Sequence, residues 1–180
     1  EMCIRDSMST ARLGAAPKPP SADDAAFKTE LVTLIPHLRA FARTLTGDPT
    51  AADDLAQDAM MKAWDARASY QMGTNMKAWT FMILRNQFYS EKRRSWRQSQ
   101  LDQEAAERTL VAVDDPEAPV ALDELRQALK TLPEEQREAL ILVGAGGFAY
   151  EEAAEICGCA VGTVKSRVSR ARRALQATLE

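Results

Sequence analysis

Apolar residues recur at intervals of three and four along most of the chain, which is the spacing of one face of an α-helix. Leu31, Leu34, Leu38, Phe41 and Leu45 are the first such series, and they predict an amphipathic helix over residues 27–46 that ends at the sequence Gly-Asp-Pro. Similar patterns predict further helices over residues 50–70, 76–97, 122–132, 134–143, 150–157 and 161–175. The strict alternation typical of strands does not occur in the sequence. We therefore expect an all-α protein.

The helical pattern is interrupted once over a long stretch, between residues 98 and 119. This interruption predicts two small helical domains, at residues 25–97 and 120–178, joined by a flexible linker over residues 98–119. The first 24 residues show no periodicity and carry Pro17, Pro19 and Pro20, so residues 1–24 are predicted to be a disordered tail. Met8 is a candidate natural start within it.

The last predicted helix has one apolar stripe and one cationic face. At 100° per residue, Val161, Val164 and Val168 lie on one side with Ala171 and Leu175. The segment carries five basic residues in fifteen, namely Lys165, Arg167, Arg170, Arg172 and Arg173. A solvated surface helix whose arginines complement its own dipole would show the same pattern.

The residues before that helix favour a more specific structure. Ala154, Gly158 and Val164 supply a small residue, a turn glycine and an apolar residue at offsets of four and ten. This is the spacing of a helix-turn-helix, whose second helix enters the major groove of DNA. Ala160 stands at the predicted cap of the second helix and has no side-chain acceptor, a loss of roughly 1 kcal/mol.

Charge divides the chain more sharply than hydrophobicity does. The formal net charge is −3, yet residues 77–97 carry six basic residues against Glu91, and residues 161–180 carry five against Glu180. Residues 98–124 carry eight acids against Arg108. Two basic surfaces separated by an acidic linker suggest contact with one polyanion at two places.

The basic part of residues 76–97 also contains aromatic residues. Its first half is apolar on two faces and is expected to be buried, whereas Tyr89 and Trp96 stand among the cations of the second half. Aromatic rings among cations suit single-stranded DNA, because unpaired bases stack on rings while the backbone follows positive charge. The alternative is a core helix with a solvated basic end.

The helix predicted over residues 50–70 has an unusual polar face. Asp54, Asp58 and Asp65 form an outward stripe together with Met61. Like charges four residues apart repel each other mildly in a helix, so the stripe is odd for a merely solvated surface. It would suit docking onto a basic protein partner.

Other function classes find little support in the sequence. No nucleophile and base set, metal cluster or phosphate-binding loop is apparent, so we expect neither an enzyme nor a cofactor or metal. Cys3, Cys157 and Cys159 suggest no disulfide framework and a reducing, cytoplasmic location, with Cys157 packed as a small apolar residue. No apolar run reaches the length of a membrane span, and no signal-peptide pattern occurs.

Together these segments resemble the bacterial RNA polymerase sigma factors of the extracytoplasmic-function (ECF) group. "DDLAQDAMMKAW" is similar to their region 2.2, "NMKAWTFMILRNQFYSEKRR" to regions 2.3 and 2.4, and the segment from "LPEEQREAL" to the last helix to region 4. "EICGCAVGTVKSRV" most resembles the general-stress-response (EcfG-type) group. The resemblance covers about residues 27–175.

The resemblance implies partners and a role for particular residues. It implies a factor that binds core RNA polymerase and directs it to the −35 and −10 elements of stress-response promoters, and that is inhibited by a small helical (NepR-like) anti-sigma factor. The implied polymerase contacts are Asp54, Gln57, Asp58 and Met61. The implied −10 contacts are Asn75, Arg85, Asn86, Tyr89, Arg93 and Arg94, with the "SYQMGTN" loop holding a flipped base. The implied −35 contacts are Thr163, Lys165, Ser166, Arg167, Arg170 and Arg173.

The linker length agrees with this interpretation. Promoter elements about 17 base pairs apart are separated by roughly 58 Å at ~3.4 Å per step, and the 22 residues from Gln98 to Pro119 can extend to roughly 75 Å. One alternative is a sigma-like decoy that sequesters an anti-sigma factor without touching DNA, although a decoy would not need two basic surfaces. Another is a helix-turn-helix repressor, which would leave the acidic stripe unexplained.

Overall fold

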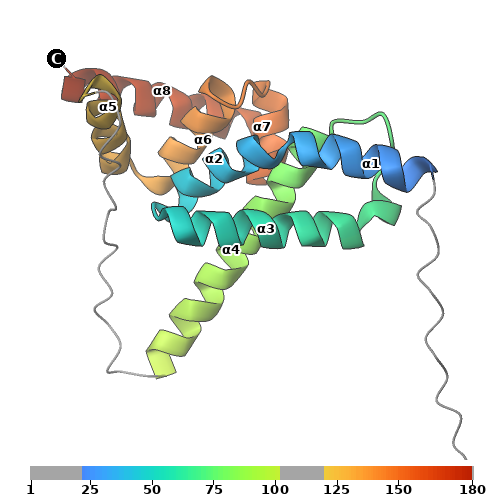
Figure 1. Ribbon diagram of the computed structural model, residues 1–180. Coiled ribbons are helices and arrows are strands. Elements are labelled where there is room, and N and C mark those ends of the chain that lie inside the picture. The colour runs from blue at the N-terminus through green and yellow to red at the C-terminus, as the bar shows by residue number, and fades with distance from the viewer. Residues whose placement is uncertain (1–21, 102–119, 180) are drawn as a thin grey trace, which may run out of the picture.

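The computed structural model describes residues 22–101 and 120–179, which form eight α-helices and one short 3₁₀ helix with no strand among them (Figure 1). The predicted all-α class is confirmed. The elements are α1 (Ala22–Thr33), α2 (Ile35–Thr46), α3 (Pro49–Asp65), η1 (Arg67–Ser69), α4 (Met76–Leu101), α5 (Val120–Thr131), α6 (Glu134–Gly144), α7 (Tyr150–Cys157) and α8 (Val161–Leu179). Most of the predicted tail and linker lies outside the described residues, but α1 and α4 extend into both predicted segments.

The first predicted helix is in fact two helices that meet at Leu34. Pro36 stands in the first turn of α2. A proline has no N–H to donate and its ring collides with the carbonyl four residues earlier, here that of Val32, so a continuous helix cannot pass through this position. Leu34 instead forms a tight turn, its N–H donating to the Leu31 carbonyl at 3.1 Å. The second predicted helix is also shorter, since α3 ends at Asp65 and η1 continues the chain.

Helices α1 to α4 form the first lobe, whose centre is built on stacked aromatic rings and small residues. Phe41 of α2 stacks on Phe81 of α4 with ring centroids 4.8 Å apart. Ala52, Ala56 and Ala59 line the inner face of α3 and are fully or almost fully buried. Alanine at these positions lets the helix backbones approach closely. A second aromatic cluster joins Phe27, Trp64, Tyr70 and Trp79 at the other end of the lobe.

Helices α5 to α8 form the second lobe, and α7 and α8 form the predicted helix-turn-helix. Ala154 and Val164 are buried where the two helices meet. Gly158 ends α7 in the left-handed conformation, with φ 63° and ψ 40°, which a side chain would make costly. The turn is closed by the N–H of Cys159, which donates to the Ala154 carbonyl at 3.1 Å. The spacing of these residues in the sequence therefore identified the motif correctly.

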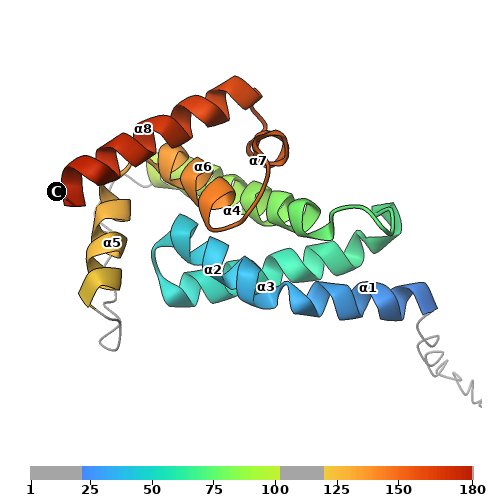
Figure 2. The ribbon, with the colours of Figure 1, turned by 90° about the horizontal axis from the view of Figure 1, so that it is seen from above.

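The two lobes pack against each other, which the sequence did not predict. Helix α4 lies against α7, and α2 lies against α6, so that α3 and α8 stand on opposite sides of the molecule (Figure 2). Phe148, in the loop before α7, meets Phe81 edge to face with centroids 5.0 Å apart. Gly146 makes this loop possible, because a Cβ there would lie 2.5 Å from the Leu142 carbonyl oxygen and 2.9 Å from the Phe148 ring. One hydrophobic cluster consequently runs through both lobes.

Candidate nucleic-acid interface

Helix α8 presents most of its predicted DNA-contacting residues to solvent. Val164, Val168 and Ala171 are buried against the lobe. The exposed residues on the rest of its surface include Thr163, Lys165, Arg170, Arg172 and Arg173. The apolar stripe thus fixes the helix while the cationic face remains accessible, as the sequence predicted.

Arg167 is held inside the lobe rather than presented to solvent. Its side chain is 18% exposed and forms an ion pair with Glu135 at the start of α6. Its guanidinium also lies 3.6 Å from the Cys159 sulfur. Ser166, beside it, is half-buried. These contacts tie α8 to α6, so Arg167 has a structural partner that sequence reasoning did not anticipate.

Helix α4 changes character along its length. Its first half is embedded in the lobe through Phe81 and Leu84, which are 3% and 0% exposed. Residues 91–98 are all exposed, among them Arg93 and Arg94. Trp96 in this part is 63% exposed. Figure 1 shows this end of α4 extending away from the other helices. A basic helix end with an accessible ring is therefore available to a partner.

Three other residues predicted at the −10 surface face the second lobe. Arg85 Nε donates to Glu138 Oε1 at 2.6 Å, and the Tyr89 hydroxyl donates to Glu138 Oε2 at 3.3 Å. The Arg85 guanidinium also lies over the Tyr89 ring, 4.5 Å from its centroid. Asn75 Nδ2 donates to Glu152 Oε1 at 2.6 Å. Asn75 is nevertheless exposed, as is Asn86, whereas Arg85 and Tyr89 are half-buried.

Glu138 is the acidic centre of this contact between the lobes. It is 1% exposed, and burial raises its pKa above the ordinary value although the hydrogen bond and charge of Arg85 lower it. Burial also raises the pKa of Tyr89, and the carboxylates of Glu138 and Glu134 add to the effect. Tyr89 is consequently a neutral hydrogen-bond donor at physiological pH. Sequence reasoning missed Glu138, because a glutamate in an amphipathic helix ordinarily faces solvent.

The predicted polymerase-binding residues share one exposed face of α3. Asp54, Gln57 and Asp58 are exposed, and Met61 is 58% exposed. Leu55 and other residues on the opposite face are buried. The structure therefore presents these four side chains together on one accessible face of α3.

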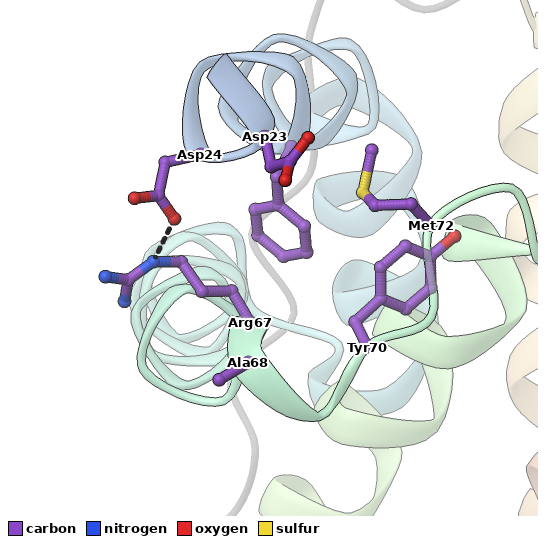
Figure 3. A pocket seen from close by; sticks show the side chains of 7 residues that line it. Asp23, Asp24, Arg67, Ala68, Tyr70 and Met72 are labelled. Atoms are coloured by element: carbon purple, nitrogen blue, oxygen red, sulfur yellow. Dashed lines mark hydrogen bonds and ion pairs between the residues drawn. The ribbon is translucent and has the colours of Figure 1, made fainter. Parts of the chain in front are cut away.

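The loop predicted to hold a flipped base borders a pocket (Figure 3). The Tyr70 hydroxyl donates to the Thr74 carbonyl at 2.7 Å, which closes the loop on itself. Tyr70 and Met72 form one wall, and α1 and η1 form the other, joined at the rim by an ion pair of 2.8 Å between Asp24 and Arg67. The hollow has a volume of about 340 Å³. The contribution of α1 was not predicted, since its first residues were assigned to the disordered tail.

Two other kinds of site are absent from the described residues. No group of three or more His, Cys, Asp or Glu side chains among them could hold a metal ion. None of the helices in that part of the chain is both long and apolar enough to cross a membrane.

Comparison with known proteins identifies both lobes. The family model for sigma-70 region 2 matches residues 31–98, and that for sigma-70 region 4 matches residues 122–175. The chain is 47% identical over 152 residues to the ECF RNA polymerase sigma factor EcfG of Rhodopseudomonas palustris (strain TIE-1), covering 84% of each protein. It is 34% identical over 135 residues to the ECF RNA polymerase sigma-E factor of Escherichia coli (strain K12), covering 68% of this chain and 70% of that protein.

Solved structures agree with the sequence matches. The sigma factor RpoE of Bartonella quintana, in complex with the anti-sigma factor NepR, is 48% identical and superposes with a TM-score of 0.76, over 86% of this chain and 96% of that one. CnrH, in complex with the cytosolic domain of CnrY, is 26% identical with a TM-score of 0.64, over 88% of this chain and 90% of that one. The chain therefore belongs to the ECF RNA polymerase sigma factors. It directs transcription initiation, and its partners are core RNA polymerase and promoter DNA.

Proposed function

We propose that this sigma factor directs polymerase to stress-response promoters, with each of three surfaces serving one partner. The acidic stripe of α3 binds core polymerase, α8 reads the −35 element, and α4 with the loop over residues 71–75 engages the −10 element. The observation that carries the proposal is the separation of these surfaces. The stripe and the cationic face of α8 are both exposed and lie on opposite sides of the molecule, so polymerase and duplex DNA can be bound together.

Helix α8 suits duplex DNA in its major groove. Thr163, Arg170 and Arg173 are exposed along one face of a helix that its buried valines hold in place. The major groove admits an α-helix, and arginine recognises guanine there through two hydrogen bonds. Arg172 and Lys165 lie beside that face, where they would contact phosphates.

The exposed end of α4 suits DNA strands that have separated. Arg93 and Arg94 supply positive charge to the backbone, and Trp96 offers a ring on which a base can stack. The pocket beside the loop could receive a base that has left the stack, since Tyr70 and Met72 give it an apolar wall. An aromatic wall favours an unpaired base by stacking.

An anti-sigma partner is part of the same proposal. The Bartonella sigma factor that this chain matches across both lobes was solved with NepR bound. We infer that a small helical protein of this kind binds the chain as well. We further propose that the factor acts in the cytoplasm, where its polymerase and DNA partners are, and that it has no catalytic activity of its own.

The decoy interpretation remains the alternative to test. The PhyRSL–NepR structure from Sphingomonas sp. Fr1 has a TM-score of 0.60 at 21% identity, which shows the fold alone. A decoy must bind the anti-sigma factor, but it need not bind or melt a promoter. The exposed cations of α8 and of the end of α4 favour the transcription factor.

The deciding experiment is promoter opening with purified core polymerase. The protein and core enzyme are incubated on a stress-type promoter, and unpaired thymines at the −10 element are detected with permanganate, with run-off transcription measured in parallel. We expect both a footprint and a transcript that depend on the sigma factor. The absence of a footprint on every stress-type promoter tested would favour the decoy.

A further inference from the structure

We propose that Glu138 is an internal competitor of promoter DNA: by binding Arg85 and Tyr89, it holds the second lobe closed over the −10 surface in the protein without partners. The inference rests on the proposed −10 role of those two residues. It assigns to the chain itself an inhibition that requires no anti-sigma factor.

Several contacts between the lobes join a hydrogen-bond donor of the first lobe to an acceptor of the second. Besides Glu138, Glu134 forms an ion pair with Lys92 of α4. Lys77 Nζ donates to the Gly146 carbonyl at 2.7 Å and lies over the Phe148 ring, 5.0 Å from its centroid. The second lobe therefore supplies acceptors to the same helix that is proposed to bind the DNA backbone.

A carboxylate can replace DNA at Arg85 because the chemistry of recognition is similar. Guanidinium groups bind carboxylates and phosphates through the same charge-assisted N–H donors. Both oxygens of Glu138 are engaged, Oε1 by Arg85 and Oε2 by Tyr89, and the Arg85 side chain is only 17% exposed. A nucleotide cannot take these two donors until Glu138 withdraws from them.

The closed arrangement is also incompatible with binding both promoter elements at once. Lys92 of α4 is paired with Glu134, and Arg167 of α8 is paired with the adjacent Glu135. Consecutive Cα atoms are about 3.8 Å apart, whereas the −10 and −35 elements are roughly 58 Å apart at ~3.4 Å per base pair. Because Lys92 and Arg167 pair with consecutive residues of α6, these two cations lie much closer together than the two promoter elements. The lobes must come apart when the promoter is bound.

The energetics allow such an opening. Burying an ion pair costs desolvation energy that can equal or exceed the attraction between the charges. Glu138 is completely covered in the closed form, and Glu134 has one buried oxygen without a hydrogen-bond partner. Separation of the lobes returns both carboxylates to water. The intact pair therefore adds little net stability to the closed form, but removing the Glu138 charge leaves the Arg85 cation covered without its partner, which favours opening.

The test compares the full-length protein with Glu138→Gln and a matched control, Glu155→Gln. Both changes remove one negative charge from the second lobe, but Glu155 is exposed on α7. The radius of gyration from small-angle X-ray scattering reports lobe opening. Fluorescence anisotropy with the labelled non-template strand of a −10 element reports DNA binding. We expect Glu138→Gln to increase the radius of gyration and to tighten DNA binding about fivefold or more, the range of a typical coupling between two sites. Glu155→Gln should change neither by a comparable amount.

A second variant guards against a local folding defect at the buried position. Glu134→Gln releases Lys92 from the edge of the same contact, and circular dichroism verifies the helix content of every variant. We expect it to open the lobes as well, to a smaller extent. If neither variant enlarged the molecule, the internal competition would be overturned, while the permanganate assay would still test the −10 assignment separately. Opening without tighter DNA binding would overturn the competition and would also count against the −10 role of Arg85 and Tyr89.

Discussion

At the scale of single residues, burial determines which side chains are chemically available. Cys157 is 5% exposed in the core of the helix-turn-helix, and burial, with a smaller contribution from the Glu138 carboxylate, raises the pKa of its thiol to about 12. The thiolate is the reactive form of cysteine. Cys159, two residues later, is half-buried beside Arg167. The two cysteines of one short turn should therefore differ in reactivity.

We predict that iodoacetamide at pH 8 modifies Cys159 in the native protein long before Cys157, which should react only after unfolding. At pH 8 a thiol with a pKa of about 12 is almost entirely protonated, and the core also excludes the reagent. The protein is labelled with and without denaturant, and mass spectrometry of its peptides measures the modification of both cysteines in each sample. Equal native rates at the two cysteines would contradict the buried position of Cys157.

The cations of α8 should also differ from one another. We predict that Arg170→Ala alters which −35 sequence is preferred, with a cost of about 1–3 kcal/mol at the affected base pair. Arg172→Ala should weaken binding to all sequences alike and reduce its salt dependence, as the loss of a phosphate contact does. Binding to a panel of −35 variants at two salt concentrations separates these results. If Arg170→Ala changed neither affinity nor preference, the assignment of α8 as the reading helix would be wrong.

At the scale of elements, α3 and α4 each combine a buried face with an exposed one. In α3 the buried face is lined by alanines that fit against α2 and α4, so the exposed stripe can change without disturbing the core. In α4 the division runs along the helix, from an embedded first half to an exposed basic end. Function can thus be tested on these helices with little effect on the fold.

We predict that the double variant Asp54→Lys with Asp58→Lys abolishes binding to core polymerase while leaving thermal stability within a few degrees of the wild type. Both side chains point outward, and surface changes of this kind usually alter stability by about 0.5 kcal/mol or less. Co-purification with core enzyme measures the effect. The matched control reverses Asp23 and Glu30, two exposed acids of α1, and should retain binding. Normal co-purification of the stripe variant would refute the polymerase assignment.

At the scale of the whole molecule, the two lobes share a hydrophobic cluster as well as polar contacts. Phe81 joins the core of the first lobe to Phe148 of the second. The arrangement leaves the cationic face of α8, the stripe of α3 and the end of α4 accessible, and it half-buries Arg85 and Tyr89. The proposed −10 role of Arg85 and Tyr89 therefore depends on how the two lobes are arranged.

We predict that Arg93→Ala with Arg94→Ala retains binding to core polymerase but loses most of the permanganate footprint at the −10 element. Both arginines lie on the exposed end of α4, so their loss should weaken binding to the separated DNA strand without disturbing the fold. The control pair is Lys28→Ala with Arg43→Ala, which removes two exposed cations from α1 and α2. A normal footprint from the α4 variant would show that strand separation depends on other residues.

Local patterns of residues were sufficient to determine the fold class, the helix-turn-helix and the orientation of the α3 stripe. Helical periodicity depends on neighbours three or four positions apart, and the motif depends on the spacing of Ala154, Gly158 and Val164. The break at Leu34 was also encoded locally, by Pro36, although the strong apolar pattern around it concealed the signal. These features follow from interactions within one or two turns of the chain.

Tertiary structure alone decided which of the polar residues pair with residues from distant parts of the chain. Arg85 and Glu138 are 53 positions apart, and Asn75 and Glu152 are 77 apart, so no local pattern links them. The sequence predicts that Arg167 contacts DNA, but in the structure it forms an ion pair with Glu135 of another helix, α6. The pocket combines α1 with a loop more than 40 residues later. Such contacts depend on how whole helices pack, since packing brings together groups whose separation along the chain carries no periodic signal.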